Sequence, residues 1–179
     1  FVSLFDYDDY EILNQFPFSI RRKDNHYVVK ETIRNDGYVN IVNNDFSPIV
    51  IEQMSKRYSE MKTLTWDVMD ITKMTYNDQF FDAVLDKGTI DALTCGEDDE
   101  NQIFKACCEY VRVLKKNCVA YILSFGQPED RLCYFDPQRD HPWVFDGYDP
   151  LPYEKAPGQY YIFYKIRKKG FRGSFKSRI

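Results

Sequence analysis

The stretch Phe81-Asp82-Ala83-Val84-Leu85-Asp86-Lys87-Gly88-Thr89-Ile90-Asp91-Ala92-Leu93 decides the fold of this chain. It begins as a short apolar run typical of a strand, and a carboxylate, a lysine and a glycine follow before a helix-compatible segment. In an open α/β sheet, ligands bind outside the carboxyl ends of the strands. We therefore expect Asp86, Lys87 and Gly88 to lie at such an end, with the rest of the chain forming a ligand-binding cleft around them.

The residues ahead of this stretch predict two further strands and the helix between them. The strands are placed at residues 39–43, ending at Asn44-Asp45, and at residues 63–69, ending at Asp70. Ser47 is expected to cap the intervening helix and Pro48 to begin it, with its end near residue 59. Earlier helices are predicted at residues 10–18 and 28–35.

The second half of the chain contains a longer helix and two more strands. The helix is predicted at residues 98–115, with Lys115-Lys116-Asn117 closing it. Residues 118–125 form a near-continuous apolar run, as expected for a strand buried on both faces. Residues 126–157 contain six prolines and are predicted to be irregular, and residues 160–166 form the last strand.

Alternating strands and helices favour an α/β fold with a mostly parallel sheet and helices on both faces. The chain has 179 residues, of which 44% are hydrophobic, and this suits a single domain over residues 1–179. The net charge of −4 argues against a nucleic-acid partner held by a general basic field. No dimerisation helix is evident, so we expect a monomer.

Cysteine usage bears on the redox compartment. The five cysteines include no C-x-x-C pair, so neither a disulfide framework nor a metal site is expected. We expect buried free thiols in a reducing cytosol, and hence a cytoplasmic protein. The sequence has no apolar run long enough to span a membrane, and it opens without a signal peptide.

Three carboxylates, Asp45, Asp70 and Asp86, follow three predicted strands. Parallel strands end at the same edge of a sheet, so the three acids are expected to line one cleft. A single acid of this kind is more often a turn or capping residue, whereas three in register suit a nucleoside. The first acid would accept the ribose hydroxyls, and the second would accept an adenine amino group.

Neighbouring residues complete such a nucleoside site. The backbone N–H of Ile71 would meet a ring nitrogen of the base, and the side chains of Phe46, Met69 and Ile71 would sandwich it.

Three segments resemble a known family at this point. Residues 40–54, containing Asn43-Asn44-Asp45-Phe46-Ser47-Pro48, resemble the second-strand motif of class I S-adenosylmethionine-dependent methyltransferases, and Trp66-Asp67-Val68-Met69-Asp70-Ile71 resembles the third. The segment from Phe80 to Leu93 is the most specific match. It is similar to eukaryotic methyltransferase-like proteins that methylate lysines of translation elongation factor 1A.

The resemblance implies a Rossmann-like fold with an antiparallel terminal strand and S-adenosylmethionine as the methyl donor, with S-adenosylhomocysteine as product. It implies that Asp45 and Phe46 hold ribose and adenine, that Asp70 and Ile71 hold the adenine edge, and that Lys87 lies on the far side of the cofactor. Phe5-Asp6-Tyr7 resembles a segment near the family's N-terminus. Tyr7 would then lie near the sulfonium, although simple packing is an equal alternative.

One departure from the family concerns its glycine-rich loop. No two glycines of the chain are spaced G-x-G, and none precedes Gly37. The family's first strand and its loop are expected between Asp24 and Asn25, where Asn25 resembles the residue that follows the loop. Either those residues are missing from the chain, which we favour, or the protein is a catalytically inactive relative.

The expected activity is methyl transfer to a protein lysine, with elongation factor 1A as the candidate partner. Asp86 is the catalytic candidate, since it would contact the incoming amine or the cofactor's amino group; capping the helix at Thr89 is the alternative. Lys87 would contact the cofactor or be a surface lysine. The other functions considered are a methyltransferase for another protein or a small amine, and a non-catalytic interaction protein with this fold.

Overall fold

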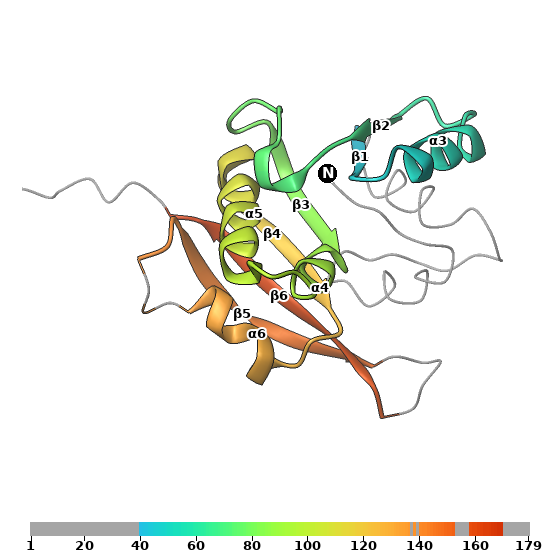
Figure 1. Cartoon of the computed structure of the whole chain (residues 1–179). Helices are drawn as coiled ribbons and strands as arrows, with labels where there is room; N and C mark the ends of the chain where they lie inside the picture. Colours follow the sequence, from blue (N-terminus) through green and yellow to red (C-terminus); the bar gives the residue numbers. More distant parts are fainter. Residues whose placement is uncertain (1–39, 137, 139, 153–157, 170–179) are drawn as a thin grey trace, which may run out of the picture.

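The computed structural model describes residues 40–136, 138, 140–152 and 158–169 (Figure 1). The helices predicted at residues 10–18 and 28–35 lie outside this part, as do Tyr7 and Asn25. The described strands are β1 (Ile41–Asp45), β2 (Leu64–Val68), β3 (Phe81–Lys87), β4 (Leu114–Ser124), β5 (Trp143–Pro152) and β6 (Tyr160–Lys168). The described helices are α3 (Pro48–Arg57), α4 (Thr89–Leu93), α5 (Asp99–Val113), α6 (Pro128–Phe135) and the 3-10 turn η2 (Ile71–Lys73).

The described strands form two sheets. β1 and β2 pair in parallel as a small sheet, and the larger sheet has the order β3-β4-β6-β5. Within the larger sheet β3 and β4 are parallel, whereas β6 runs antiparallel to both β4 and β5. The Rossmann-like α/β class is therefore confirmed, including the antiparallel last strand. We expected one sheet across all strands. In the described residues the strands form two separate sheets, because no described strand pairs with both β1 and β3.

The main core lies between the larger sheet and α5 (Figure 1). Residues 83–86 of β3 are all buried, as expected for a strand covered on both faces. α5 contributes a row of buried residues at helical spacing, which are Ile103, Ala106, Cys107, Tyr110, Val111 and Val113. This core holds the C-terminal ends of β3 and β4 in fixed register, with Lys87 opposite Leu123.

The start of α3 matches its prediction. Ser47 is the N-cap, and its Oγ accepts a hydrogen bond from the Val50 N–H at 3.3 Å. Pro48 occupies the first turn, where a missing N–H costs nothing. The helix is therefore anchored directly after β1, with two residues between the strand and its first turn.

The prediction that residues 126–157 are irregular is wrong. α6 begins at Pro128 with Glu129 and Asp130 in its first turn, where acidic side chains favour the helix dipole. β5 accommodates Pro150 and Pro152 because it is the edge strand of the described sheet, and an edge strand tolerates a residue without an N–H. Of these three prolines, two therefore lie in an edge strand and one begins a helix.

The predicted end of the long helix also needs correction. α5 ends at Val113, and Lys115, Lys116 and Asn117 belong to the first part of β4. The pairing with β3 shifts there, because Phe81 lies opposite Leu114 while Ala83 lies opposite Val119. Asn117 has a left-handed backbone with φ of 63°. This conformation lies in the segment of β4 whose residues are not paired in the regular register with β3.

Candidate cofactor and acceptor site

The carboxyl end of β1 presents Asp45 and Phe46. Asp45 Oδ1 accepts the backbone N–H of Ser47 at 2.6 Å, so one carboxylate oxygen holds the turn into α3. Phe46 follows directly and is 78% exposed, which is unusual for a large apolar side chain. The pair therefore offers an acidic group and an uncovered aromatic ring side by side at one strand end.

The carboxyl end of β2 presents Asp70, whose carboxylate is turned toward its own loop. Its Oδ1 accepts the N–H of Thr72 at 2.9 Å and the hydroxyl of the same residue at 2.7 Å, and Lys73 Nζ lies 3.3 Å from Oδ2. Partial burial opposes ionisation, but the Thr72 and Lys73 contacts prevail and lower the pKa of Asp70. Asp70 is thus a charged capping residue at the start of η2.

The ends of β1 and β2 lie next to each other. The Met69 N–H donates to the Asp45 carbonyl at 2.9 Å, directly after the paired residues Asp45 and Val68. Met69 and Ile71 are half-buried and pack against the main core. Five of the predicted cofactor residues therefore lie around one strand edge, with Phe46 exposed and the other four partly covered.

Arg112 of α5 anchors the loop that follows this edge. Its guanidinium donates to the carbonyls of Tyr76 and Met74 at 2.7 and 2.9 Å, and to the carboxylates of Asp78 and Glu109 at 2.8 and 2.6 Å. One planar side chain thereby satisfies acceptors from two segments far apart in the sequence. The loop after η2 is thus fixed to the helix that covers the larger sheet.

Asp86 differs from the other two acids in place and environment. It was expected beyond the end of its strand, but it lies within β3 opposite Ile122 and is only 4% exposed. It also belongs to the larger sheet rather than to the edge formed by Asp45 and Asp70. Its Oδ1 accepts the N–H of Thr89 at 3.2 Å, which is the capping contact considered as the alternative role.

The second carboxylate oxygen of Asp86 is buried and has no well-aligned hydrogen-bond donor among the described residues, although the Tyr110 phenol lies close to the carboxylate. Burial raises the pKa of Asp86 to about 6, and the contacts with Thr89, Tyr110 and Ile90 only partly offset it. Burial and the Asp86 charge in turn raise the pKa of the Tyr110 phenol and of the Cys107 thiol. A carboxyl group of this kind can hold a proton near neutral pH and can accept one more hydrogen bond.

Lys87 is the last residue of β3 and is half-buried. Gly88 follows with φ of 73°, a left-handed conformation that glycine adopts without strain, and its N–H donates to the Leu123 carbonyl at 3.0 Å. This turn redirects the chain into α4. The structure therefore places Asp86, Lys87 and Gly88 at the carboxyl end of β3, although Asp86 and Lys87 are themselves strand residues.

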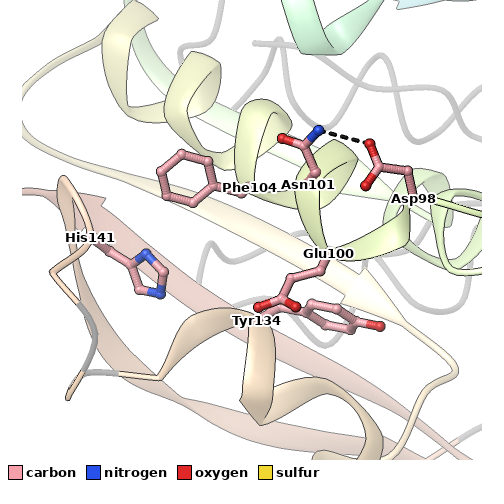
Figure 2. A pocket seen from close by; sticks show the side chains of 6 residues that line it. All are labelled: Asp98, Glu100, Asn101, Phe104, Tyr134 and His141. Carbon is pink, nitrogen blue, oxygen red and sulfur yellow. Dashed lines mark hydrogen bonds between the residues drawn. The ribbon is translucent and has the colours of Figure 1, made fainter.

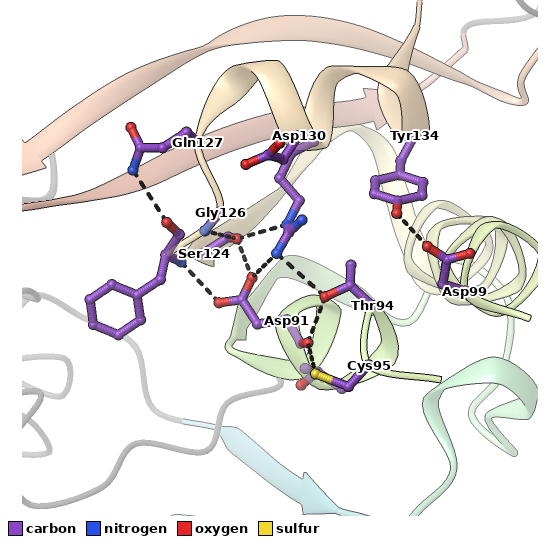
Figure 3. A network of polar contacts seen from close by, with 12 residues as sticks. Asp91, Thr94, Cys95, Asp99, Ser124, Gly126, Gln127, Asp130 and Tyr134 are labelled. Carbon is purple, nitrogen blue, oxygen red and sulfur yellow. Dashed lines mark hydrogen bonds and ion pairs between the residues drawn. The ribbon is translucent and has the colours of Figure 1, made fainter. Parts of the chain in front are cut away.

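A polar network at the adjoining end of β4 was missed from the sequence (Figure 3). The Asp91 carboxylate of α4 accepts hydrogen bonds from the Ser124 hydroxyl, from the Phe125 N–H at 2.9 Å and from Arg131 Nη2 at 3.2 Å. The last contact is a mostly buried ion pair, with 14% and 23% of the two side chains exposed. The signal was present, because Asp91 follows Gly88 by three residues at the predicted strand end.

A cavity of about 270 Å³ lies between the N-terminal half of α5, α6 and the segment before β5 (Figure 2). Its lining side chains are Asp98, Glu100, Asn101, Phe104, Tyr134 and His141. Asn101 donates to Asp98 at 2.7 Å, and His141 stacks on Trp143 with ring centroids 4.2 Å apart.

Other features of the described part bear on cofactor chemistry and on the cysteines. The described residues contain no group of three or more histidine, cysteine or acidic side chains placed to hold a metal ion. No helix among them combines the length and the apolar composition needed to cross a membrane.

The expectation of buried thiols is wrong for two cysteines, because Cys107 is buried whereas Cys95 and Cys133 are exposed.

Comparison with solved structures identifies the fold class. The N-methyltransferase NodS of Bradyrhizobium japonicum, in complex with S-adenosylhomocysteine, aligns with a TM-score of 0.56 at 13% identity, covering 73% of this chain and 67% of that one. A Burkholderia thailandensis 1,6-didemethyltoxoflavin-N1-methyltransferase aligns with a TM-score of 0.57 at 14% identity, covering 79% and 66%. These similarities establish the fold.

Sequence comparison gives the family. A family described as "Methyltransferase domain" matches residues 28–122, which is more than half of the chain, and the chain therefore belongs to that family. The EEF1A lysine methyltransferase 4 of Mus musculus is 40% identical over 63 residues, covering 35% of this chain and 25% of that protein. The eEF1A lysine and N-terminal methyltransferase of Bos taurus is 37% identical over 102 residues, covering 55% and 15%. The chain thus spans a quarter or less of these two relatives.

Proposed function

We propose that this protein is an S-adenosylmethionine-dependent methyltransferase that modifies a lysine of a protein substrate, with elongation factor 1A as the candidate. The observation that carries the proposal is the edge formed by β1 and β2. There Asp45 and the exposed Phe46 lie beside the Asp70 turn, joined by the Met69–Asp45 hydrogen bond. The names of the similar proteins support the choice of substrate.

The residues at this edge fit an adenosine group. Asp45 uses one oxygen for the Ser47 N–H, and its carboxylate can still accept a ribose hydroxyl. The exposed ring of Phe46 can stack on the base, and Met69 and Ile71 can pack beside it. Asp70 has its carboxylate occupied by Thr72 and Lys73, so we propose that it shapes the adenine pocket mainly by holding the turn.

The cofactor, when bound, supplies an electrophilic methyl group on a sulfonium. The chain's own task is to hold the acceptor amine in line with that methyl group and to exclude water. Asp86 is the candidate for a direct contact, because its buried second oxygen has no well-aligned hydrogen-bond donor among the described residues. Its role toward the amine or the cofactor stays a prediction, as do those of Lys87, Tyr7 and Asn25.

Incubation with tritiated S-adenosylmethionine and purified elongation factor 1A tests the substrate. We expect label on a lysine of the factor, located by peptide mass spectrometry. Absence of label on every lysine would reject this substrate. Labelling a cell extract and separating the products by size then distinguishes another protein acceptor from a small amine.

A second candidate function is a non-catalytic interaction protein with the same fold. The observation that favours it is the absence of a G-x-G spacing anywhere in the chain. A thermal shift with S-adenosylhomocysteine decides between the two, because a ligand that binds only the native state at 100 times its Kd stabilises it by about 2.7 kcal/mol. No shift at saturating ligand would favour the non-catalytic function.

A further inference from the structure

The turn that follows β4 is held by side chains from three different elements. Ser124 ends β4, and Phe125, Gly126 and Gln127 lead from it into α6. Asp91 of α4 accepts the Phe125 N–H, Ser124 Oγ accepts the Gly126 N–H at 2.9 Å, and Gln127 Nε2 donates to the Phe125 carbonyl at 3.2 Å. Figure 3 shows Asp91, Ser124 and Gly126 converging on this turn. We call residues 124–127 the β4 turn.

Arg131 closes the network from the α6 side. Its Nη2 lies 3.2 Å from Asp91 Oδ1 and 3.4 Å from Thr94 Oγ1, and its Nε lies 3.4 Å from Ser124 Oγ. The Asp91–Arg131 pair therefore ties the end of α4 to the beginning of α6 across the β4 turn. Partial burial of both side chains shields the pair from solvent, which makes it stronger than a surface ion pair.

Gly126 is shaped to this pair. A Cβ atom added at Gly126 would overlap the guanidinium of Arg131, so the missing side chain is what lets the arginine lie against the turn. The Gly126 carbonyl accepts a hydrogen bond from the Tyr164 hydroxyl of β6 at 2.8 Å. The β4 turn is thus fixed by Asp91, by Arg131 and by a side chain of β6.

The position of the β4 turn gives the network its significance. It follows the carboxyl end of β4, beside the carboxyl end of β3, and ligands in such sheets bind outside these ends. The proposed adenosine residues occupy the ends of β1 and β2, and Asp86 and Lys87 at the end of β3 are candidates for the cofactor or the amine. The neighbouring end of β4 is therefore the place where the methyl acceptor would meet the cofactor. Phe125 is 48% exposed there, with its ring packed on Tyr161 at a centroid distance of 3.8 Å.

The geometry points to Asp91 and Arg131 as a pair of positioning residues that hold the β4 turn, and with it the Phe125 ring, as one wall of the acceptor site. This inference rests on the proposed methyltransferase function. Neither side chain needs to touch the acceptor. Their effect is to keep the wall in one place, and a displacement of about 1 Å in such a site can lower the rate about 100-fold.

Four variants test the pair in the full chain. Asp91→Asn and Arg131→Gln remove the charge of one partner, Arg131→Lys keeps it, and Gly126→Ala displaces the guanidinium without deleting it. Arg167→Gln is the matched control, because Arg167 and Asp146 form another Arg–Asp pair at 2.8 Å on β6 and β5. All variants are first compared by circular dichroism and melting temperature.

Three measurements are then made on each folded variant. Calorimetric titration gives the Kd for S-adenosylhomocysteine, hydrogen exchange gives the protection of the Phe125 and Gly126 amides, and tritium transfer to elongation factor 1A gives kcat and KM. For Asp91→Asn and Arg131→Gln we expect faster exchange and a kcat at least tenfold lower. The acceptor KM should change less than threefold and the Kd less than twofold. Arg131→Lys should recover part of the lost kcat. The kcat of Gly126→Ala should lie between those of wild type and Arg131→Gln, and Arg167→Gln should have the wild-type kcat.

Faster exchange with unchanged kcat would overturn the inference, since the pair would then only stabilise the fold. A loss of cofactor affinity that accounts for the loss of rate would also overturn it, as would unchanged exchange and unchanged kinetics. A wild-type protein that labels no acceptor while binding S-adenosylhomocysteine would instead reject the proposed function, and the acceptor role with it. If Asp91→Asn does not fold, Gly126→Ala and Arg131→Lys still separate these outcomes.

Discussion

The small sheet of β1 and β2 and the larger sheet of β3 to β6 place similar residues in opposite environments. At the end of β1, Phe46 is 78% exposed and Asp45 is half-buried, whereas in β3 Leu85 is 1% and Asp86 is 4% exposed. Uncovered apolar surface at a strand end suits a ligand, and complete burial suits a scaffold. The comparison indicates that the larger sheet is a rigid scaffold, and that the proposed adenosine residues lie on the more exposed strand end of the small sheet.

Truncating one isoleucine in each region should separate these roles most clearly. Ile103→Ala removes a fully buried side chain of α5 and should lower the free energy of unfolding by about 4 kcal/mol, through lost burial and an unfilled cavity. Ile49→Ala, at a site 66% exposed on α3, should change it by no more than about 0.5 kcal/mol. Urea titration measures both, and equal losses would show that α3 is covered as tightly as α5.

Arg112 joins the two regions, so its removal should be the next largest effect. Arg112→Ala leaves the carbonyls of Met74 and Tyr76 and the Glu109 carboxylate without their donor and should cost about 3 kcal/mol of stability. Lys115→Ala is the control, because its pair with Asp82 is exposed and should contribute at most about 0.5 kcal/mol. If the two variants unfold at the same urea concentration, the hydrogen bonds of Arg112 do not contribute measurably to the stability of the fold.

The buried acid of the larger sheet should make stability depend on pH. The pKa of Asp86 is raised to about 6 in the folded state from 3.8, so the folded protein binds the proton more tightly than the unfolded chain. The contribution of this proton to the free energy of unfolding is fully present below pH 3.8 and is lost as the pH rises through 6. The loss amounts to about 3 kcal/mol.

Asp86→Asn removes this titration. The stability of the wild type relative to the variant should therefore fall between about pH 4 and pH 6 and stay flat above it, as followed by urea unfolding at a series of pH values. Asp82→Asn, in the same strand but with an exposed side chain, is the control for the loss of a carboxylate. A flat difference for Asp86→Asn across this range would mean that the carboxyl group is not desolvated.

The smallest expected effect concerns the small sheet and the proposed cofactor. Asp45→Asn keeps a side-chain oxygen for the Ser47 N–H but weakens the acceptor offered to ribose, so S-adenosylhomocysteine should bind about tenfold more weakly, or about 1.4 kcal/mol. Glu52→Gln on the exposed side of α3 should leave the Kd unchanged. Equal affinities for wild type and Asp45→Asn would remove this edge from the cofactor site.

Local sequence signals predicted the elements that carry strong periodicity or capping. The Ser47-Pro48 helix start, the buried run of β3 and the apolar spacing of α5 each follow from residues close together in the chain. Residues 126–157 were misread because a proline has the same sequence appearance at a helix start, on an edge strand and in a loop, and only the pairing with β6 distinguishes them.

The site was predictable in part for the same reason. Asp45 ends β1 and Asp70 lies two residues after β2, so their common edge could be inferred from parallel pairing alone. The Asp91–Arg131 pair joins residues 40 positions apart, and its formation depends on α6, which was not predicted. The burial of Asp86 likewise depends on how α5 covers β3, which no short motif encodes.

The prolines of β5 have a consequence for how the molecule meets other copies of itself. Pro150 and Pro152 lie on the outermost described strand, opposite Ile162 and Tyr160. Each lacks the N–H that an incoming strand would need as a donor. The second half of β5 is therefore a poor template for intermolecular β-pairing. The two prolines thereby disfavour fibril-like stacking of chains along the β5 edge.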